Sequence, residues 1–430
     1  MLLIYTQKLT PRVDYVFKHI CTRILGLKIE FTSAIEEFIS YPGVKLSYGK
    51  QPLGNELFFY SQGLLQTQGF EDVSISVKPW EETVGFFSAS EKSALPFDIF
   101  AASFYLLSRY EEFQPHVKDA LGRFPAQESL AYKEGFLEQP VIDLWAFKFK
   151  AVLSENFSEM EFPKRSFQIH NIVEAKRPYE FLQRGFLRSF LGFGGDFWKL
   201  RLRRVFLRTR VLLHLRKDPY DTFNWILNND KNSRAKLTVF FLLGEGYTFR
   251  EDFNTKKEKF KNLIKYVGDY SEIGLAFSYH ALHDYEKLKL QKKQLEEITH
   301  RPLQSSFNDK QLINLPTIYR DLVELEIERD FTMFYYNEIG FRAGTCTPFL
   351  FYDLDYEVKT PLTIHPVVGK SLALTLGNEN DLEGRIMKVF HWVEKVQGTF
   401  SFFFSNRDFS QSKENKTWRY LFSEKLNPHA

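Results

Sequence analysis

The sequence predicts an α/β protein of two domains, and three observations lead to this prediction. The chain has 430 residues, which at ~100–200 residues per domain corresponds to two domains. Its 44% hydrophobic and 26% charged residues are typical of a globular protein. Short apolar runs alternate along the chain with stretches of helical spacing, and this order favours the α/β class.

Residues 1–162 are expected to form an N-terminal α/β domain. Its boundary is placed beside Pro163, which stands between two charged clusters. The expected strands are 2–5, 27–31 and 56–60, and the expected helices are 12–25, 97–110 and 140–149.

Residues 163–430 are expected to form a barrel-like domain of parallel strands and intervening helices. In such a domain the chemistry lies at the carboxyl ends of the strands. The expected strands are 166–171, 237–243, 272–277, 332–335, 362–365 and 398–404, and the expected helices are 256–266, 283–298 and 382–396.

A basic helical insertion over 184–217 interrupts this alternation. It holds ten Arg or Lys residues against one acid, Asp196, with aromatic and aliphatic residues between them. One interpretation is a helical insertion whose apolar stripe packs on the domain while its arginine side is solvated. The other is a peripheral contact with an anionic membrane surface.

Composition excludes several classes of protein. The 57 basic and 54 acidic residues nearly balance, which argues against a nucleic-acid partner. No apolar stretch approaches the ~20 residues of a membrane-spanning helix, and the N-terminus lacks the features of a signal peptide. Two cysteines, Cys21 and Cys346, cannot form a disulfide framework, so we expect a cytoplasmic protein.

Several motifs resemble a family from Bacteroidota, the polysaccharide deacetylase-like proteins. These pair an N-terminal α/β domain of unknown function with a distorted (β/α) barrel of the NodB-homology, family-4 carbohydrate esterase type. The resemblance implies the same fold here and a role in cell-surface polysaccharide metabolism. The matching segments are residues 4–12, 93–98, 104–112, 123–126, 216–223, 340–349 and 364–366.

The resemblance also implies where catalytic groups should stand. The esterases hold a divalent metal with one Asp and two His, use a second Asp as base, and use a His near the last strand as acid. At the matching positions this sequence departs from the pattern in all four motifs. The departures are Gln168 and His170 for the paired carboxylates, Ala276 for a metal-binding His, Asn308 for another His, and Ser405 for the acid.

A rearranged metal site is the alternative. His170, His280 and His283 offer imidazoles, which bind zinc and other divalent metals well. Under this alternative the protein is an active metal-dependent carbohydrate N-deacetylase with zinc or another divalent metal; otherwise no cofactor is expected.

Three residues inside or beside preserved motifs are candidates for substrate binding. They are Arg342, Thr345 and His365. The planar donor fork of Arg342 suits a carboxylate or an acetylated sugar, although it can equally bridge barrel loops. His365 precedes Pro366, so a role in a turn is the alternative there.

The sequence therefore predicts a catalytically degenerate deacetylase-like protein. We expect a pseudoenzyme that binds a carbohydrate or polysaccharide as a glycan-binding or assembly subunit. A membrane-surface scaffold that works through residues 184–217 is the remaining alternative.

Overall fold

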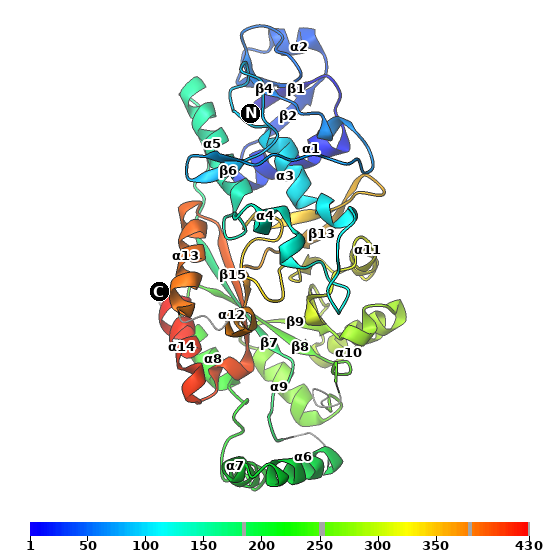
Figure 1. The fold of residues 1–430 in the computed structure, drawn as a ribbon, viewed down its shortest axis with the longest axis vertical. Helices are drawn as coiled ribbons and strands as arrows, with labels where there is room; N and C mark the ends of the chain where they lie inside the picture. The colour runs from blue at the N-terminus through cyan, green and yellow to red at the C-terminus, as the bar shows by residue number, and fades with distance from the viewer. Residues whose placement is uncertain (183–185, 249–253, 377–380, 429–430) are drawn as a thin grey trace.

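A computed structural model describes residues 1–182, 186–248, 254–376 and 381–428. Figure 1 shows an elongated molecule with the N-terminal part at one end, a larger α/β part in the middle and a helical hairpin at the other end.

The N-terminal part is built around a four-stranded parallel sheet of order β2-β1-β3-β4. Helix α1 begins after Thr10, whose hydroxyl accepts a hydrogen bond from the Val13 amide, and it continues into a π-helical turn over 18–24. The elements are β1 (Leu2–Thr6), α1 (Pro11–Phe17), β2 (Ile29–Thr32), α2 (Ile35–Ser40), β3 (Lys45–Gly49), β4 (Leu57–Tyr60), β5 (Lys78–Trp80), β6 (Thr83–Gly85), α3 (Ile99–Leu107), α4 (Leu130–Lys133) and α5 (Val141–Asn156).

The larger part alternates strands and helices. Its elements are β7 (Gln168–Ala175), α6 (Phe186–Trp198), α7 (Leu202–Leu212), α8 (Phe223–Asp230), β8 (Lys236–Leu242), α9 (Glu258–Gly268), β9 (Glu272–Phe277), α10 (Tyr285–Thr299), β10 (Ser305–Asn308), α11 (Thr317–Glu324), β11 (Arg329–Asp330), β12 (Phe349–Asp353), β13 (Val358–Ile364), β14 (Gly369–Lys370), α12 (Ser371–Leu376), α13 (Leu382–Lys395), β15 (Thr399–Ser405) and α14 (Lys416–Tyr420).

The second sheet has nine strands in the order β12-β13-β11-β10-β9-β8-β7-β15-β14. All neighbours pair in parallel except β12 and β13. Among the described residues no pairing joins β12 to β14, so the expected barrel is not closed. The fold is mixed α/β, and its larger sheet is open.

This open sheet is nevertheless strongly curled. Phe307 of β10 and Phe403 of β15 have ring centroids 4.7 Å apart, although β9, β8 and β7 lie between their strands. The concave face is filled by apolar side chains, and five of them are phenylalanines. This inner cluster consists of Ile172, Phe240, Leu242, Ala276, Phe307, Phe331, Phe334, Val367 and Phe403. The high phenylalanine content therefore forms core, as its large apolar rings favour.

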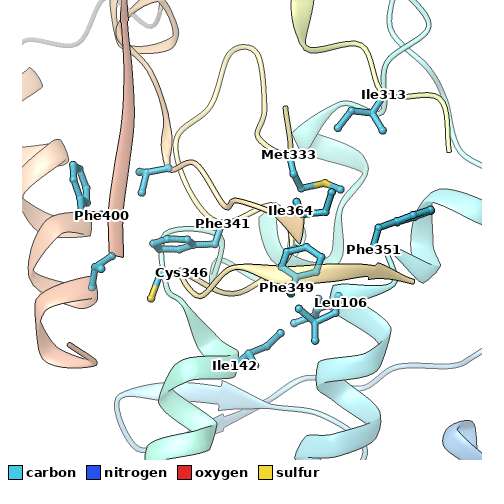
Figure 2. Packing of buried hydrophobic residues seen from close by; sticks show 14 of the residues in the cluster. Leu106, Ile142, Ile313, Met333, Phe341, Cys346, Phe349, Phe351, Ile364 and Phe400 are labelled. Atoms are coloured by element: carbon cyan, nitrogen blue, oxygen red, sulfur yellow. The ribbon is translucent and has the colours of Figure 1, made fainter. Parts of the chain in front are cut away.

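The two parts share one continuous core. The Tyr15 hydroxyl donates to the Leu350 carbonyl at 2.7 Å, and the Tyr15 ring lies 4.9 Å from that of Tyr352. Figure 2 shows Leu106 and Ile142 of the N-terminal helices near Phe349 of β12, with Phe341 and Cys346 in the adjoining loop.

Most expected elements are confirmed, although the bounds of several differ, and two differences concern the site. The expected strand 272–277 is β9 with the same bounds. The expected strand 332–335 is wrong: β11 ends at Asp330, and the following segment turns inward so that Phe331 and Phe334 fill the inner cluster. The expected strand 166–171 is too short, because β7 runs on to Ala175.

Candidate functional site

The carboxyl ends of β7, β15 and β14 bring together a group of charged and polar side chains. Glu174 lies near the end of β7 and pairs in register with Ser405 of β15. Lys370 ends β14 on the far side of β15. Because side chains alternate along a strand, Glu174 projects to the same concave side as Ile172 of the inner cluster, and Lys176 directly follows the strand. We name Glu174, Lys176, Asp309, Lys370, Ser405 and Arg407 the carboxyl-end site.

Glu174 and Lys370 form a buried ion pair at the centre of this site. The two residues are 4% and 7% exposed. Burial alone would raise the pKa of Glu174, but the charges of Lys370 and Lys176 more than offset it, so the pKa lies below its ordinary value. Glu174 is therefore a carboxylate at neutral pH, and an ammonium group already contacts it.

A second ion pair joins β7 to the loop after β10. Lys176 Nζ lies 2.8 Å from Asp309 Oδ1. Lys310 and Gln311, the next two residues, have φ angles of 59° and 54°, a left-handed conformation that is costly for residues other than glycine. Within the described part of the chain, Asp309 Oδ2 and Gln311 Oε1 are buried without a hydrogen-bond partner. Strain and unsatisfied oxygens thus coincide at the carboxyl end of β10, as they do at many functional sites.

Two adjoining cavities open beside the site. One, of about 550 Å³, is lined by residues that include Lys370, Ser405, Arg407 and Asp408. The other, of about 780 Å³, also includes Arg407 and Asp408 and extends to Tyr220. The Asp408 carboxylate accepts the Ser405 amide at 2.7 Å and also the Ser371 hydroxyl, which fixes the ends of β15 and β14 together.

Arg407 stands at the wall that the two cavities share. Its side chain is exposed, its Nε donates to Ser405 Oγ at 3.3 Å, and its guanidinium lies 5.9 Å from the Tyr220 ring. Arg177 approaches the same ring at 5.3 Å. An arginine fork beside an aromatic ring in a concave site can bind a polar, anionic or hydroxyl-rich ligand.

Of the positions matched to esterase motifs, Ala276, Asn308 and Ser405 lie at the carboxyl ends of β9, β10 and β15. Ala276 is a member of the inner cluster and offers no polar group. The Asn308 amide group donates to the Leu312 carbonyl at 3.0 Å, so it holds its own loop.

Gln168 and His170 lie at the opposite end of the sheet, which corrects their placement in the first motif. His170 pairs with Lys236, the first residue of β8, whereas Ala276 pairs with Leu242. Six residues of a strand separate those two rows, a distance of about 20 Å. His170 Nε2 is 2.8 Å from Thr238 Oγ1, and burial holds its pKa well below the ordinary value.

The three histidines of the rearranged metal site are therefore not brought together. His280 and His283 follow the carboxyl end of β9, are exposed, and flank the Tyr279 ring at 5.6 and 6.2 Å. In the chain as described, no group of three or more His, Cys, Asp or Glu side chains is arranged to hold a metal ion. The carboxyl-end donors do not fit a divalent cation either, since lysines occupy both Glu174 and Asp309.

His365 directly follows the carboxyl end of β13, and its ring lies near that of His170. Its ring stacks on Phe331 at 4.6 Å, and the His170 ring meets the same phenylalanine edge-on at 5.3 Å. Burial, with Arg329 and Lys236 nearby, lowers the pKa of His365 to about 3. The structure thus places His365 in an aromatic stack with Phe331, beside His170.

Arg342 is fully engaged between the two parts of the chain. Its Nε and Nη2 donate to the two carboxylate oxygens of Glu112 at 2.9 and 2.6 Å. Arg109 also donates to Glu112, at 2.7 Å, and the Arg342 side chain is only 2% exposed. The donor fork expected to bind substrate is used to join the N-terminal part to the loop before β12.

Thr345 also joins the two parts of the chain. Its hydroxyl donates to Asp143 Oδ2 of α5 at 2.6 Å, and the Cys346 amide donates to the same oxygen at 3.0 Å. Arg165 pairs with the other oxygen of Asp143 at 3.1 Å. The preserved motif at 340–349 therefore holds α5 against the larger sheet.

Glu174, Lys176, Lys370 and Arg407 were not among the residues expected from the sequence. One signal was available: Glu174 and Lys176 have the i, i+2 spacing expected of paired groups at the end of a first strand. The expected strand ended at Asn171, three residues before Glu174.

A family model described as a family of unknown function (DUF7033) matches residues 2–158. No match was found among curated proteins.

Solved structures similar to the chain include three carbohydrate-related proteins. The first is 4-alpha-glucanotransferase from Thermococcus litoralis, with 15% identity and a TM-score of 0.34 over 61% of this chain and 36% of that one. The chain thus spans about a third of that enzyme. The second, assigned as a polysaccharide deacetylase from Mycobacterium smegmatis, has 12% identity and a TM-score of 0.38 over 62% of this chain and 86% of that one. The third is a BA3943 mutant, a CE4 family pseudoenzyme with restored activity, with 10% identity and a TM-score of 0.26 over 55% and 66% of the two chains.

Proposed function

We propose that this protein is a polysaccharide deacetylase-like protein that binds a glycan at the carboxyl-end site and does not hydrolyse it. Its place is in cell-surface polysaccharide metabolism, as a glycan-binding or assembly subunit. The observation that carries the proposal is the paired cavity at the ends of β14 and β15, in which Arg407 stands beside Tyr220.

The chemistry of the cavity wall supports a sugar ligand. Pockets that bind small ligands combine apolar or aromatic surface with a few fixed polar groups. Here Tyr220 supplies aromatic surface, and Arg407 supplies an exposed polar group that Ser405 Oγ holds in place. Arg407 is held by Ser405 and by the tyrosine ring, so its donors are preorganised.

The ion pairs made by the carboxylates of Glu174 and Asp309 support binding without hydrolysis. A general base must have a free lone pair within reach of the water that it activates. Glu174 and Asp309 each contact a lysine ammonium group, and the pKa of Glu174 is lowered, which makes it a weaker base. Ser405, in register beside Glu174, does not titrate near neutral pH.

Titration calorimetry with N-acetylchitotetraose and with a hyaluronan tetrasaccharide tests the proposal. We expect wild type to bind at least one of them and Arg407→Ala to bind about ten- to a hundredfold more weakly, the loss of one charge-assisted contact. Arg234→Ala, an exposed arginine before β8, is the matched control and should bind as wild type does. Equal affinity of wild type and Arg407→Ala would remove Arg407 from the site.

A further inference from the structure

The α6–α7 hairpin (residues 186–212) stands apart from the body of the molecule, at the end opposite the N-terminal part (Figure 1). Its base is fixed on both sides. Asp218, after α7, accepts the amides of Glu180 and Phe181 before α6 at 2.7 and 2.8 Å. Arg204 of α7 pairs with Glu180 at 2.8 Å. The hairpin is therefore presented on an ordered base.

The two helices are locked to each other by the one acid in the segment. Asp196 of α6 pairs with Arg208 of α7 at 2.5 Å, and Arg204 Nε lies 3.7 Å from the same carboxylate. The other described basic side chains of the segment are exposed. They are Lys199, Arg201, Arg203, Arg210, Arg216 and Lys217.

The apolar side chains of the hairpin are exposed as well, which corrects the expectation that they pack on the domain. Trp198 is 89% exposed and Leu200 is 81% exposed, although these are residue types that folding normally buries. Other exposed apolar residues are Phe190, Phe193, Phe197, Leu202, Phe206, Leu212, Leu213 and Leu215. Arg184, where the insertion was expected to begin, lies outside the described residues.

We propose that the α6–α7 hairpin docks on an anionic lipid bilayer and lies in its interface. From Phe197 to Arg204, aromatic and aliphatic residues are interleaved with Lys199, Arg201 and Arg203 at the turn between the helices. Aromatic and aliphatic side chains insert at the headgroup level, and lysine and arginine pair with anionic lipid. Each basic residue near such a surface adds to the attraction.

The length of the helices and their charge decide between a bilayer interface and other occupants. Helices of 13 and 11 residues are about 20 and 16 Å long, too short for a ~30 Å hydrocarbon core. Consistently, no helix among the described residues has the length and apolar character to cross a membrane. A second copy of the chain would bring two strongly basic segments together, and their repulsion opposes that contact.

Docking would also bring the larger cavity to the membrane surface. Leu207 of α7 and Arg216 line that cavity together with Arg407. The hairpin and the carboxyl-end site therefore share one end of the molecule.

Sedimentation with vesicles tests the proposal on the full chain. Vesicles of phosphatidylcholine alone are compared with vesicles of equal parts phosphatidylcholine and phosphatidylglycerol. We expect the partition coefficient to be at least about tenfold higher on the anionic vesicles, and to fall when salt rises from ~0.1 to ~0.5 M. Equal partition on both lipids would overturn the proposal.

Matched variants separate the contribution of the apolar side chains to vesicle binding from that of the basic side chains. Trp198→Ser with Leu200→Ser should lower the partition coefficient about tenfold, and Arg201→Glu with Arg203→Glu should abolish the preference for anionic lipid. Two control changes lie outside the hairpin: Tyr356→Ser, at a residue that is 70% exposed, and Lys289→Glu on α10. Each should leave the partition coefficient and the preference for anionic lipid unchanged. Each variant is first shown by thermal unfolding to be folded. A contrary result would be a dimer, found by light scattering, that Trp198→Ser with Leu200→Ser disrupts, with no vesicle binding by wild type. That result would assign the exposed surface of the hairpin to a second copy of the chain.

Discussion

Lys370 at the end of β14 reaches across β15 to contact the carboxylate of Glu174 on β7. The two residues are 196 positions apart in the sequence, and both are buried. The pair joins the edge strand to the first strand of the larger sheet, and it neutralises a carboxylate at the end of the sheet where (β/α) proteins place their chemistry.

The first prediction concerns this pair. Glu174→Gln should lower the free energy of unfolding by about 3–5 kcal/mol, because it leaves the Lys370 ammonium buried without its partner. Urea unfolding at pH 7 measures the change. The double variant Glu174→Leu with Lys370→Met is the control and should lose less than Glu174→Leu or Lys370→Met alone, since no charge is left buried. Additive losses would show that the pair is not coupled.

Arg342 should matter for stability and not for ligand binding. Arg342→Ala removes the two-point partner of the buried Glu112 carboxylate and leaves it with Arg109 alone, so we expect a loss of about 2–3 kcal/mol in the free energy of unfolding. The affinity for the chito- or hyaluronan tetrasaccharide should stay within about twofold of wild type. Lys388→Ala on α13, a largely exposed partner of Glu138, is the comparison and should cost at most about 1 kcal/mol. A variant of full stability that no longer binds glycan would return Arg342 to the binding site.

His365 predicts a specific pH dependence of stability. Its pKa is about 3 in the folded protein and ~6.5 in the unfolded chain, so below pH ~6.5 the unfolded chain takes up a proton that the folded protein refuses. Its contribution is therefore complete above pH ~6.5 and is lost as the pH falls toward 3, by about 1.4 kcal/mol per pH unit.

Urea unfolding of wild type and His365→Gln between pH 6.5 and 4.5 measures this slope. The variant should show a shallower decline than wild type. His391→Gln, on the exposed side of α13, should keep the wild-type slope. Parallel curves for wild type and His365→Gln would mean that His365 titrates normally in the folded protein.

Sequence patterns predicted the elements that are decided locally. The strand at 272–277 and the helices near 258–268 and 285–299 follow from apolar periodicity alone. The strand β7 runs on to Ala175, whereas the expected strand ended at Asn171 and so did not reach Glu174. Its partner, Lys370, comes from the opposite edge of β15, and no local pattern reveals that pairing.

The position of the site could not be predicted from the sequence either, because contacts between distant segments determine it. Gln168 and His170, which were matched to a catalytic motif, lie at the far end of the sheet, and six residues of strand separate the row of His170 from that of Ala276. Arg342 was assigned to substrate because its partner, Glu112, belongs to the other part of the chain. In both cases the residue type was noticed, but its neighbours are set by the tertiary fold.

Native mass spectrometry of the protein incubated with N-acetylchitotetraose and added zinc tests the central claim most directly, because it reports binding and acetyl loss in one spectrum. We predict a one-to-one complex whose ligand keeps its full mass, and a complex that is lost in Arg407→Ala. A released ligand lighter by one acetyl group would contradict the claim that the site binds without hydrolysis. Absence of any complex in wild type would contradict the choice of an N-acetylated glycan.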